Sequence, residues 1–174
     1  MTLSALQHLI RSAQALAEDT HLLVLGSASL LASFPDLGNH DAILSATYDA
    51  DLLPQPFEEL TAIMLDEALG EQRAYYRRYG YHADILRASI VDTLPQGWTE
   101  RTVAIEGTQA HALDPYDLAA VKLLVGRVKD LELVKHLVSS NRLQIDQIQE
   151  RINLLPIPVE MHPRIQSCLA GLGK

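Results

Sequence analysis

The chain has 174 residues, of which 48% are hydrophobic, enough for one domain or for one domain with a helical extension. Its 22 acidic and 14 basic side chains give a formal charge of −8, which argues against a broad nucleic-acid surface, because such a surface would be basic. The single cysteine, Cys168, excludes an internal disulfide, and neither a signal peptide nor an apolar run of roughly 18 residues is visible. These features predict a soluble cytoplasmic protein.

The first part of the chain predicts three helices and a pair of strands. Apolar side chains recur three or four residues apart over 2–18, which indicates an amphipathic helix. The apolar run 22–25 predicts a buried strand at 21–25 that stops at small residues, and a short helix is expected at 28–34. A second strand is expected at 46–53, and the apolar spacing over 56–69 predicts a helix whose apolar face is buried.

Two carboxylates on the second predicted strand form the first candidate site. Side chains alternate between the faces of a strand, so Asp49 and Asp51 should stand side by side. Such a pair repels unless a cation lies between the two groups, and hard oxygen ligands suit Mg²⁺ or Mn²⁺. The Gly26-Ser27 turn adds a place where backbone can approach a ligand and offer N–H groups to phosphate. A phosphate cradle beside paired carboxylates is the minimum equipment for nucleotidyl transfer.

The segment 70–80 concentrates tyrosine and arginine, and two interpretations of it remain open. It is either an exposed helix or loop whose long side chains lie along the surface, or an element that contacts a nucleotide or RNA.

A third strand is predicted at 81–86 and a fourth at 101–106. Asp84 is unusual in a strand, where aspartate is depleted, so it is either a sheet-edge residue or a third carboxylate facing the first two. His82 should lie on the same face as Asp84, where a hydrogen-bonded structural role is commoner for a lone histidine than metal ligation.

From Asp114 onward the pattern is helical, starting with an aspartate cap followed by Pro115. Valine and leucine side chains at 118–138 form an apolar stripe that should be buried, including Val125 and Val128. Further helices are predicted at 143–153 and 163–170.

Lys122 and Lys129 are seven residues apart and should share a helical face away from that stripe. Two interpretations stay open for them. They belong to a solvated face that carries an Arg127–Asp130 pair, or they form a phosphate-binding set.

Taken together, these motifs resemble known families. Gly-Ser-Ala after an apolar strand, followed by Thr-x-Asp-x-Asp on the next strand, resembles the signature of the polymerase-beta-like nucleotidyltransferase superfamily. The later motifs include Tyr79-Gly80-Tyr81-x-Ala83-Asp84, Leu94-Pro95-x-Gly97-Trp98-x-x-Arg101 and Lys122-x-x-x-Gly126-Arg127-x-Lys129-Asp130. With these, residues 20–155 resemble an uncharacterised bacterial family of nucleotidyltransferase-like proteins, itself similar to the nucleotidyltransferase toxins of abortive-infection toxin–antitoxin systems.

The resemblance implies a role for each candidate residue. Asp49, Asp51 and Asp84 would be the catalytic carboxylates and the ligands of Mg²⁺ or Mn²⁺. The nucleotide would be bound by Gly26, Ser27, Lys122, Arg127 and Lys129, and Asp130 would orient a basic partner. The implied fold is α/β (α+β), with a small mixed sheet of about four strands flanked by helices at 1–110 and a helical C-terminal part at 111–174 packed on it.

The leading functional prediction is metal-dependent transfer of a nucleoside monophosphate from an NTP to an unknown acceptor, either RNA such as tRNA or a protein. The resemblance also implies that the protein belongs to a toxin–antitoxin system and has a cognate partner protein encoded nearby. Two alternatives remain open. One is a non-catalytic nucleotide-binding or antitoxin-like partner protein of the same fold, and the other is a metal-dependent phosphohydrolase.

Overall fold

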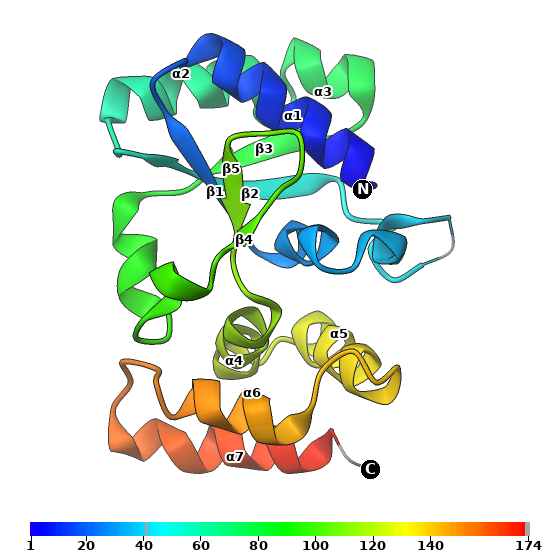
Figure 1. Ribbon diagram of the computed structural model, residues 1–174, viewed down its shortest axis with the longest axis vertical. Coiled ribbons are helices and arrows are strands. Elements are labelled where there is room, and N and C mark those ends of the chain that lie inside the picture. The colour runs from blue at the N-terminus through cyan, green and yellow to red at the C-terminus, as the bar shows by residue number, and fades with distance from the viewer. Residues whose placement is uncertain (41, 173–174) are drawn as a thin grey trace. The chain divides into compact units, whose positions relative to one another are not determined.

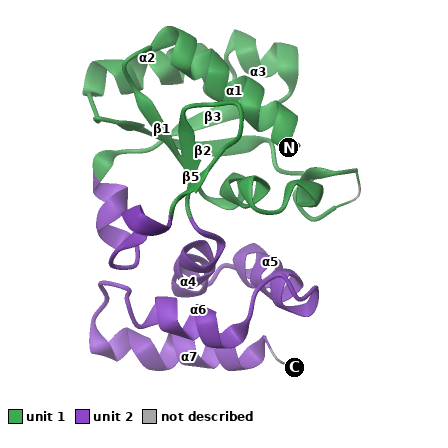
Figure 2. Ribbon diagram, in the orientation of Figure 1, with its two compact units in different colours: residues 1–88, 102–113 green, residues 89–101, 114–174 purple. Residues whose placement is uncertain are grey.

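The computed structural model describes residues 1–40 and 42–172, which form two compact units (Figures 1 and 2). Unit 1 consists of residues 1–88 and 102–113, and unit 2 consists of residues 89–101 and 114–174. Unit 1 contains a mixed five-stranded sheet with helices beside it, and unit 2 is helical. The predicted fold class is therefore confirmed, with one strand more than expected.

The sheet of unit 1 has the strand order β3-β2-β1-β5-β4. Its strands are β1 (His21–Leu25), β2 (Asp49–Gln55), β3 (His82–Ile85), β4 (Val103–Ala104) and β5 (Ala110–Ala112). β1 pairs antiparallel with β2 and parallel with β5, β2 pairs parallel with β3, and β4 pairs antiparallel with β5. β1 is the central strand, which is why four of its five residues are apolar and buried. The predicted strand at 101–106 is only the two residues of β4, and β5 was not predicted.

Three α-helices of unit 1, α1 (Leu3–Leu16), α2 (Glu59–Leu69) and α3 (Ala74–Tyr79), gather on one side of the sheet (Figure 1). α1 begins at Thr2, whose hydroxyl accepts a hydrogen bond from the Ala5 N–H, and it buries the apolar face that its spacing predicts. The short helix expected after β1 is a 3₁₀ segment, η1 (Ser27–Ala32), and η2 (Pro35–Gly38) follows it.

The prediction that the apolar face of the helix at 56–69 is buried is wrong for most of that face. Of its apolar side chains, α2 buries Leu65 and Leu69, whereas Leu60 is 81% exposed and Ile63 and Met64 are also exposed. α2 therefore has apolar side chains on two sides, and one side has no covering within the described residues.

Unit 2 contains four α-helices, α4 (Pro115–Val125), α5 (Val128–Ser139), α6 (Ile145–Ile152) and α7 (His162–Gly171). It also has the 3₁₀ segments η3 (Ala88–Thr93), which begins at the last residue of unit 1, η4 (Trp98–Arg101) and η5 (Val159–Met161). The Asp114 carboxylate caps α4 by accepting hydrogen bonds from the N–H groups of Tyr116 and Asp117, as its sequence predicts.

The predicted apolar stripe over 118–138, which Gly126-Arg127 interrupts in the sequence, is divided between two helices, and the predicted burial of Val125 and Val128 is wrong, because α4 ends at Gly126. This glycine has φ +69°, in the left-handed region that terminates many helices. Val125 and Val128 lie on either side of the break, and both side chains are exposed. Because α5 begins anew after this glycine, its buried face does not continue the helical spacing of α4.

A buried carboxylate connects three elements of unit 2. Asp117 in α4 is fully buried and accepts hydrogen bonds from the Arg101 guanidinium, with its closest contact at 2.9 Å. Arg151 in α6 lies 3.2 Å from the same carboxylate. The Arg101 of the predicted Leu-Pro-x-Gly-Trp-x-x-Arg motif thus has a structural partner, since two cations compensate one buried charge.

No helix among residues 1–40 and 42–172 is both long enough and apolar enough to cross a membrane.

Candidate functional site

Three carboxylates of unit 1 come together where β2 and β3 run side by side. Asp49 and Asp51 alternate with buried Ala50 on β2, and Asp84 on β3 is the register partner of Asp51. One carboxylate oxygen from each aspartate lies within 4.8 Å of the others. The alternation of side chains along β2 and the parallel pairing with β3 therefore produce the acidic triad that the motifs predict.

The triad fits a small divalent cation. Oxygen ligands of one Mg²⁺ lie about 2.1 Å from the ion, so two of them are at most about 4.2 Å apart. In octahedral coordination at most one pair among three ligands is that far apart and the other pairs are about 3 Å apart, so the three carboxylates, whose oxygens lie within 4.8 Å of one another, would have to close in around the ion. Asp51 is half-buried and the Asp84 side chain is 50% exposed, which leaves the group accessible to an ion and to a ligand.

The negative charges of the site affect the protonation of Asp84. Partial burial raises the pKa of the Asp84 carboxyl above its usual value, and the nearby charges of Asp49 and Glu71 raise it further. His82 acts in the opposite direction. A cation at the triad would relieve this crowding of carboxylates, which is the electrostatic argument for a metal site.

Gly26 connects the turn after β1 to the triad. It has φ +58°, a conformation that favours glycine, and its carbonyl accepts hydrogen bonds from the N–H and hydroxyl of Ser29. A Cβ atom added at Gly26 would overlap the carboxylate of Asp51. The absence of a side chain at Gly26 therefore makes room for a carboxylate of the triad, and the approach of this backbone to a phosphate stays a prediction.

His82 is the residue beside the triad whose role the sequence did not specify. Its ring is buried, its Nε2 atom lies 3.3 Å from Oδ1 of Asp84, and the ring of Tyr76 packs edge-on against it at 5.0 Å. Its Nδ1 atom is buried without a hydrogen-bond partner among the described residues. The contact between Nε2 and Asp84 is the one that favours a hydrogen-bonded role for His82. In the sequence, the two-residue spacing between His82 and Asp84 indicates that both side chains lie on the same face of a strand.

The tyrosine- and arginine-rich segment forms α3, and its tyrosines take part in the packing of unit 1. The hydroxyl groups of Tyr75 and Tyr81 lie 2.7 and 2.8 Å from Nδ1 of His8, on α1. Burial of Tyr75 raises the pKa of its hydroxyl above the usual value. Tyr79 packs against the same histidine. These contacts give the tyrosines a packing role within unit 1, which neither of the two interpretations specified.

The arginines of this segment also have partners within unit 1. Arg73 lies 3.3 Å from the Asp66 carboxylate, and Arg77 donates a hydrogen bond to the backbone carbonyl of Gln72. The Arg78 guanidinium lies 5.5 Å from the ring centre of Tyr79. All three residues remain exposed, in the manner of long side chains that lie along a helix surface.

The predicted phosphate-binding residues of unit 2 form a separate group. The Lys122 Nζ atom donates a 2.7 Å hydrogen bond to Oδ1 of Asp130, and the Arg127 Nε atom donates one of the same length to Oδ2. Burial opposes the charge of Asp130, but these two cations outweigh it and lower the pKa of the carboxyl. Asp130 therefore pairs with both basic side chains, and its orienting role in nucleotide binding stays a prediction.

Lys122 and Lys129 do not share one helix face, so that prediction is wrong. Lys122 belongs to α4 and is buried in its ion pair, whereas Lys129 belongs to α5 and is exposed. The left-handed Gly126 ends α4 between them and removes the heptad relation on which the prediction depended.

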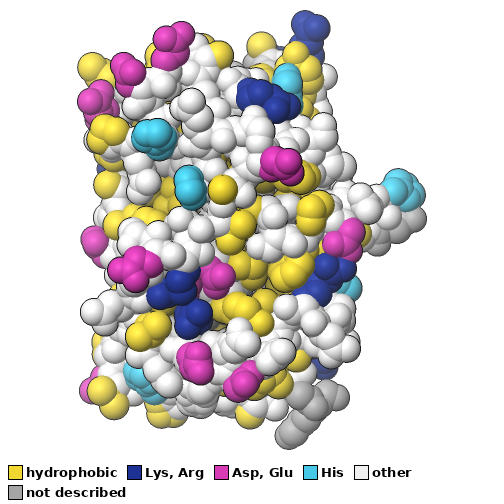
Figure 3. All heavy atoms as spheres, in the orientation of Figure 1, with side chains coloured by type: hydrophobic (Ala, Val, Ile, Leu, Met, Phe, Trp, Pro, Cys, Tyr) yellow, Lys and Arg dark blue, Asp and Glu magenta, His cyan; other side chains and the backbone are white. Residues whose placement is uncertain are grey.

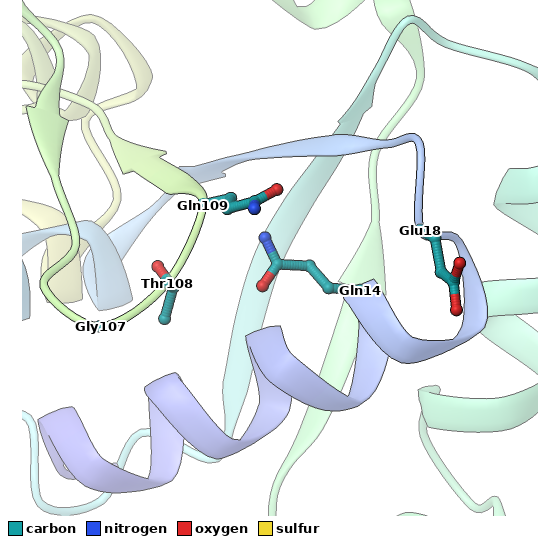
Figure 4. Close-up of a pocket in the computed structure, with 5 residues that line it drawn as sticks. All are labelled: Gln14, Glu18, Gly107, Thr108 and Gln109. Atoms are coloured by element: carbon teal, nitrogen blue, oxygen red, sulfur yellow. The ribbon is translucent and has the colours of Figure 1, made fainter.

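A separate hollow of about 440 Å³ lies in unit 1, lined by Gln14, Glu18, Gly107, Thr108 and Gln109 (Figure 4). The amide groups of Gln14 and Gln109 point toward one another there. Its lining contains one carboxylate and no basic side chain. This hollow offers neither paired metal ligands nor a cation for phosphate, which makes it a poorer candidate for that chemistry than the triad.

A comparison with protein-family models gives the deciding observation. The model of a family described as "nucleotidyltransferase of unknown function" (DUF6036) matches residues 2–161. The chain belongs to this family of nucleotidyltransferases. The matched range includes the acidic triad, the Gly26 turn and the basic residues of α4 and α5, so the predicted nucleotidyltransferase-like family is confirmed. A search of the curated proteins and a search of the solved structures found no match.

Proposed function

We propose that unit 1 transfers a nucleoside monophosphate from an NTP to an acceptor, using a divalent cation held by Asp49, Asp51 and Asp84. The observation that carries the proposal is the convergence of three carboxylates within 4.8 Å, beside a glycine turn, in a chain of the nucleotidyltransferase family. Mg²⁺ is the preferred ion and Mn²⁺ a substitute, because the donor set is made of carboxylate oxygens. When bound, the cation would offset the charge of the triphosphate.

In this reaction an acceptor hydroxyl oxygen forms a bond to the α-phosphorus of the NTP. The bond from that phosphorus to the bridging oxygen breaks, and pyrophosphate leaves with the electron pair. The hydroxyl proton passes to a base, and Asp84 is our candidate, because its carboxylate is half exposed beside the other two aspartates. Asp49 and Asp51, fixed by the pairing of β2 with β1 and β3, would position the reacting groups.

The Gly26-Ser27 turn is our candidate for contact with the triphosphate, because the Gly26 backbone lies against the Asp51 carboxylate. A phosphate-binding role for Lys122, Arg127 and Lys129 is a separate proposal that rests on the family resemblance. Within unit 2, Lys122 and Arg127 already hold Asp130, whereas Lys129 is exposed.

The acceptor would be a hydroxyl of RNA or of a protein. Unit 1 contains 13 acidic and 5 basic residues, a formal charge of 5 − 13 = −8, and this charge weighs against RNA as the acceptor. A protein acceptor fits the proposed place in a toxin–antitoxin system, in which the chain would act on or bind a cognate protein.

The proposal is tested with α-labelled NTPs, Mg²⁺, and either total tRNA or the soluble proteins of a bacterial extract. We expect label to enter one acceptor class, and Asp51→Asn to abolish the incorporation. Binding of Mg²⁺-NTP with no transfer to either class would favour the non-catalytic nucleotide-binding alternative. Release of inorganic phosphate or pyrophosphate without label transfer would favour a phosphohydrolase.

A further inference from the structure

We propose that the exposed side of α2 is a docking surface for a basic amphipathic helix of a partner protein. The α2 face, as we name it, consists of Leu60, Ile63 and Met64. The inference depends on the packing and charge of unit 1 and is independent of the reaction proposed above.

The apolar part of this surface follows from the helical spacing of α2. Leu60, Ile63 and Met64 stand at positions i, i+3 and i+4, and their side chains are 81%, 47% and 39% exposed. Leu65 and Leu69 already supply the face that α2 packs against unit 1. A second apolar face on the same helix is unnecessary for that packing. Contiguous exposed apolar side chains of this kind mark contact surfaces.

A hollow beside the α2 face provides a place for an anchoring side chain. It has a volume of about 280 Å³ and lies between the end of α1 and the start of α2, with Leu16 and Met64 as its apolar walls. Small-molecule sites usually enclose roughly 300–1,000 Å³, so the hollow suits one large side chain of a partner better than a free ligand. A helix laid along α2 could place such a residue there.

The charge around the hollow determines which helix fits. Glu18, Asp19 and Glu58 line it, its lining contains no basic residue, and Glu59 and Glu67 are exposed on α2 itself. At the upper left of Figure 3, acidic side chains lie next to hydrophobic ones. The formal charge of the whole chain resides in unit 1, because unit 2 has 9 acidic and 9 basic residues. A partner with leucine-like anchors and flanking lysine or arginine complements both features.

Other occupants fit this surface less well. RNA and anionic membranes present phosphate groups, which the carboxylates would repel. In a two-fold dimer the same patch meets itself, so the acidic rim of one copy would face the acidic rim of the other. A basic helix is the occupant that both the apolar residues and the carboxylates favour.

The test is a fluorescence-anisotropy titration of the full chain with three synthetic peptides. The first is a helix of leucine and lysine with all leucines on one face, the second is a scrambled sequence of the same composition, and the third replaces lysine with glutamate. We expect the first peptide to bind at least about tenfold more tightly than the other two, with an affinity that falls as salt rises.

Variants locate the binding. Leu60→Ser combined with Met64→Ser should weaken the leucine–lysine helix about tenfold, whereas Val159→Ser, which removes an equally exposed apolar side chain from unit 2, should leave it unchanged. Because Leu60 and Met64 are exposed, the double variant should unfold at the same urea concentration as the wild type. Equal binding of ordered and scrambled peptides, or equal losses in both variants, would overturn the proposal. Sedimentation that shows a dimer lost only in the double variant would assign the face to a second copy instead.

Discussion

The carboxylate of Asp51 occupies the space in which a side chain at Gly26 would begin. Leu25, the residue before this glycine, pairs with Asp51 across β1 and β2, so the strand register brings the two together. Position 26 thus requires glycine for two reasons: its φ is +58°, and Asp51 of the triad leaves no room for a side chain there. This contact explains in physical terms why a glycine turn and an Asp-x-Asp strand occur together although they are distant in the sequence.

Substitution of Gly26 should destabilise the protein more than substitution of another glycine with positive φ. Gly80 has φ +76°, and no atom lies within 4 Å of a Cβ position there. Gly80→Ala should therefore lower the free energy of unfolding only by the cost of a left-handed backbone conformation, about 1–2 kcal/mol. Gly26→Ala adds the overlap with Asp51 and should cost about 3 kcal/mol or more. Urea unfolding measures both free energies, and equal losses would contradict the tight contact.

His82 should act on metal binding through Asp84. His82→Leu removes the Nε2 contact to Asp84, and the affinity for Mn²⁺ should fall about 10- to 100-fold. His82→Gln keeps a side-chain N–H donor and should restore most of that loss. His21→Leu, at an exposed histidine of β1, is the control. If His82→Leu binds Mn²⁺ as the wild type does, the histidine only fills space.

Lys122 should matter for stability whether or not it binds phosphate. Lys122→Ala leaves the buried Asp130 with only Arg127 as a partner and should cost about 2–3 kcal/mol in urea unfolding. Lys129→Ala, at an exposed position, should cost less than about 0.5 kcal/mol. The double variant Lys122→Met/Asp130→Leu should recover much of the loss, since it removes both buried charges. Equal small effects of the two alanine variants would exclude the buried pair.

The ion pairs of Asp130 predict a pH dependence. Because Lys122 and Arg127 lower the pKa of this carboxyl in the folded state, its stabilisation is complete above the unfolded pKa of about 4. It is lost as the pH falls through the lower, folded pKa. Asp130→Asn should therefore be less stable than the wild type at pH 7, and the difference should shrink below about pH 4. A difference in unfolding free energy that stays constant down to pH 3 would contradict this.

The sequence predicted the pair Asp49 and Asp51 well, because the pair depends on a local rule, whereas it left Asp84 open between a sheet edge and a third carboxylate. Alternation places Asp49 and Asp51 together, and a third short strand brings in Asp84. β5, whose sequence is Ala-His-Ala, was missed because it is short and because alanine has little preference for strands.

Burial was harder to predict, since it depends on which elements pack together. The sequence placed Lys122 on a face away from the apolar stripe, whereas the structure buries it against Asp130, a residue of the next helix. Leu60 has the spacing of a core residue but is exposed, because α2 packs on unit 1 through Leu65 and Leu69. Spacing identifies faces of a helix, but it does not determine which of two apolar faces is covered.

Calorimetric titration with Mn²⁺, and then with Mg²⁺-NTP, tests the central claim that Asp49, Asp51 and Asp84 hold a cation for nucleotide binding. The wild type should bind both, and Asp49→Asn and Asp51→Asn should each reduce the affinity about tenfold or more, because each removes one charged ligand. Without metal these variants should be as thermally stable as the wild type or more so, since they relieve repulsion between carboxylates. Glu132→Gln, at an exposed residue of α5, is the matched control. Unchanged Mn²⁺ and Mg²⁺-NTP affinities in both aspartate variants would contradict the account.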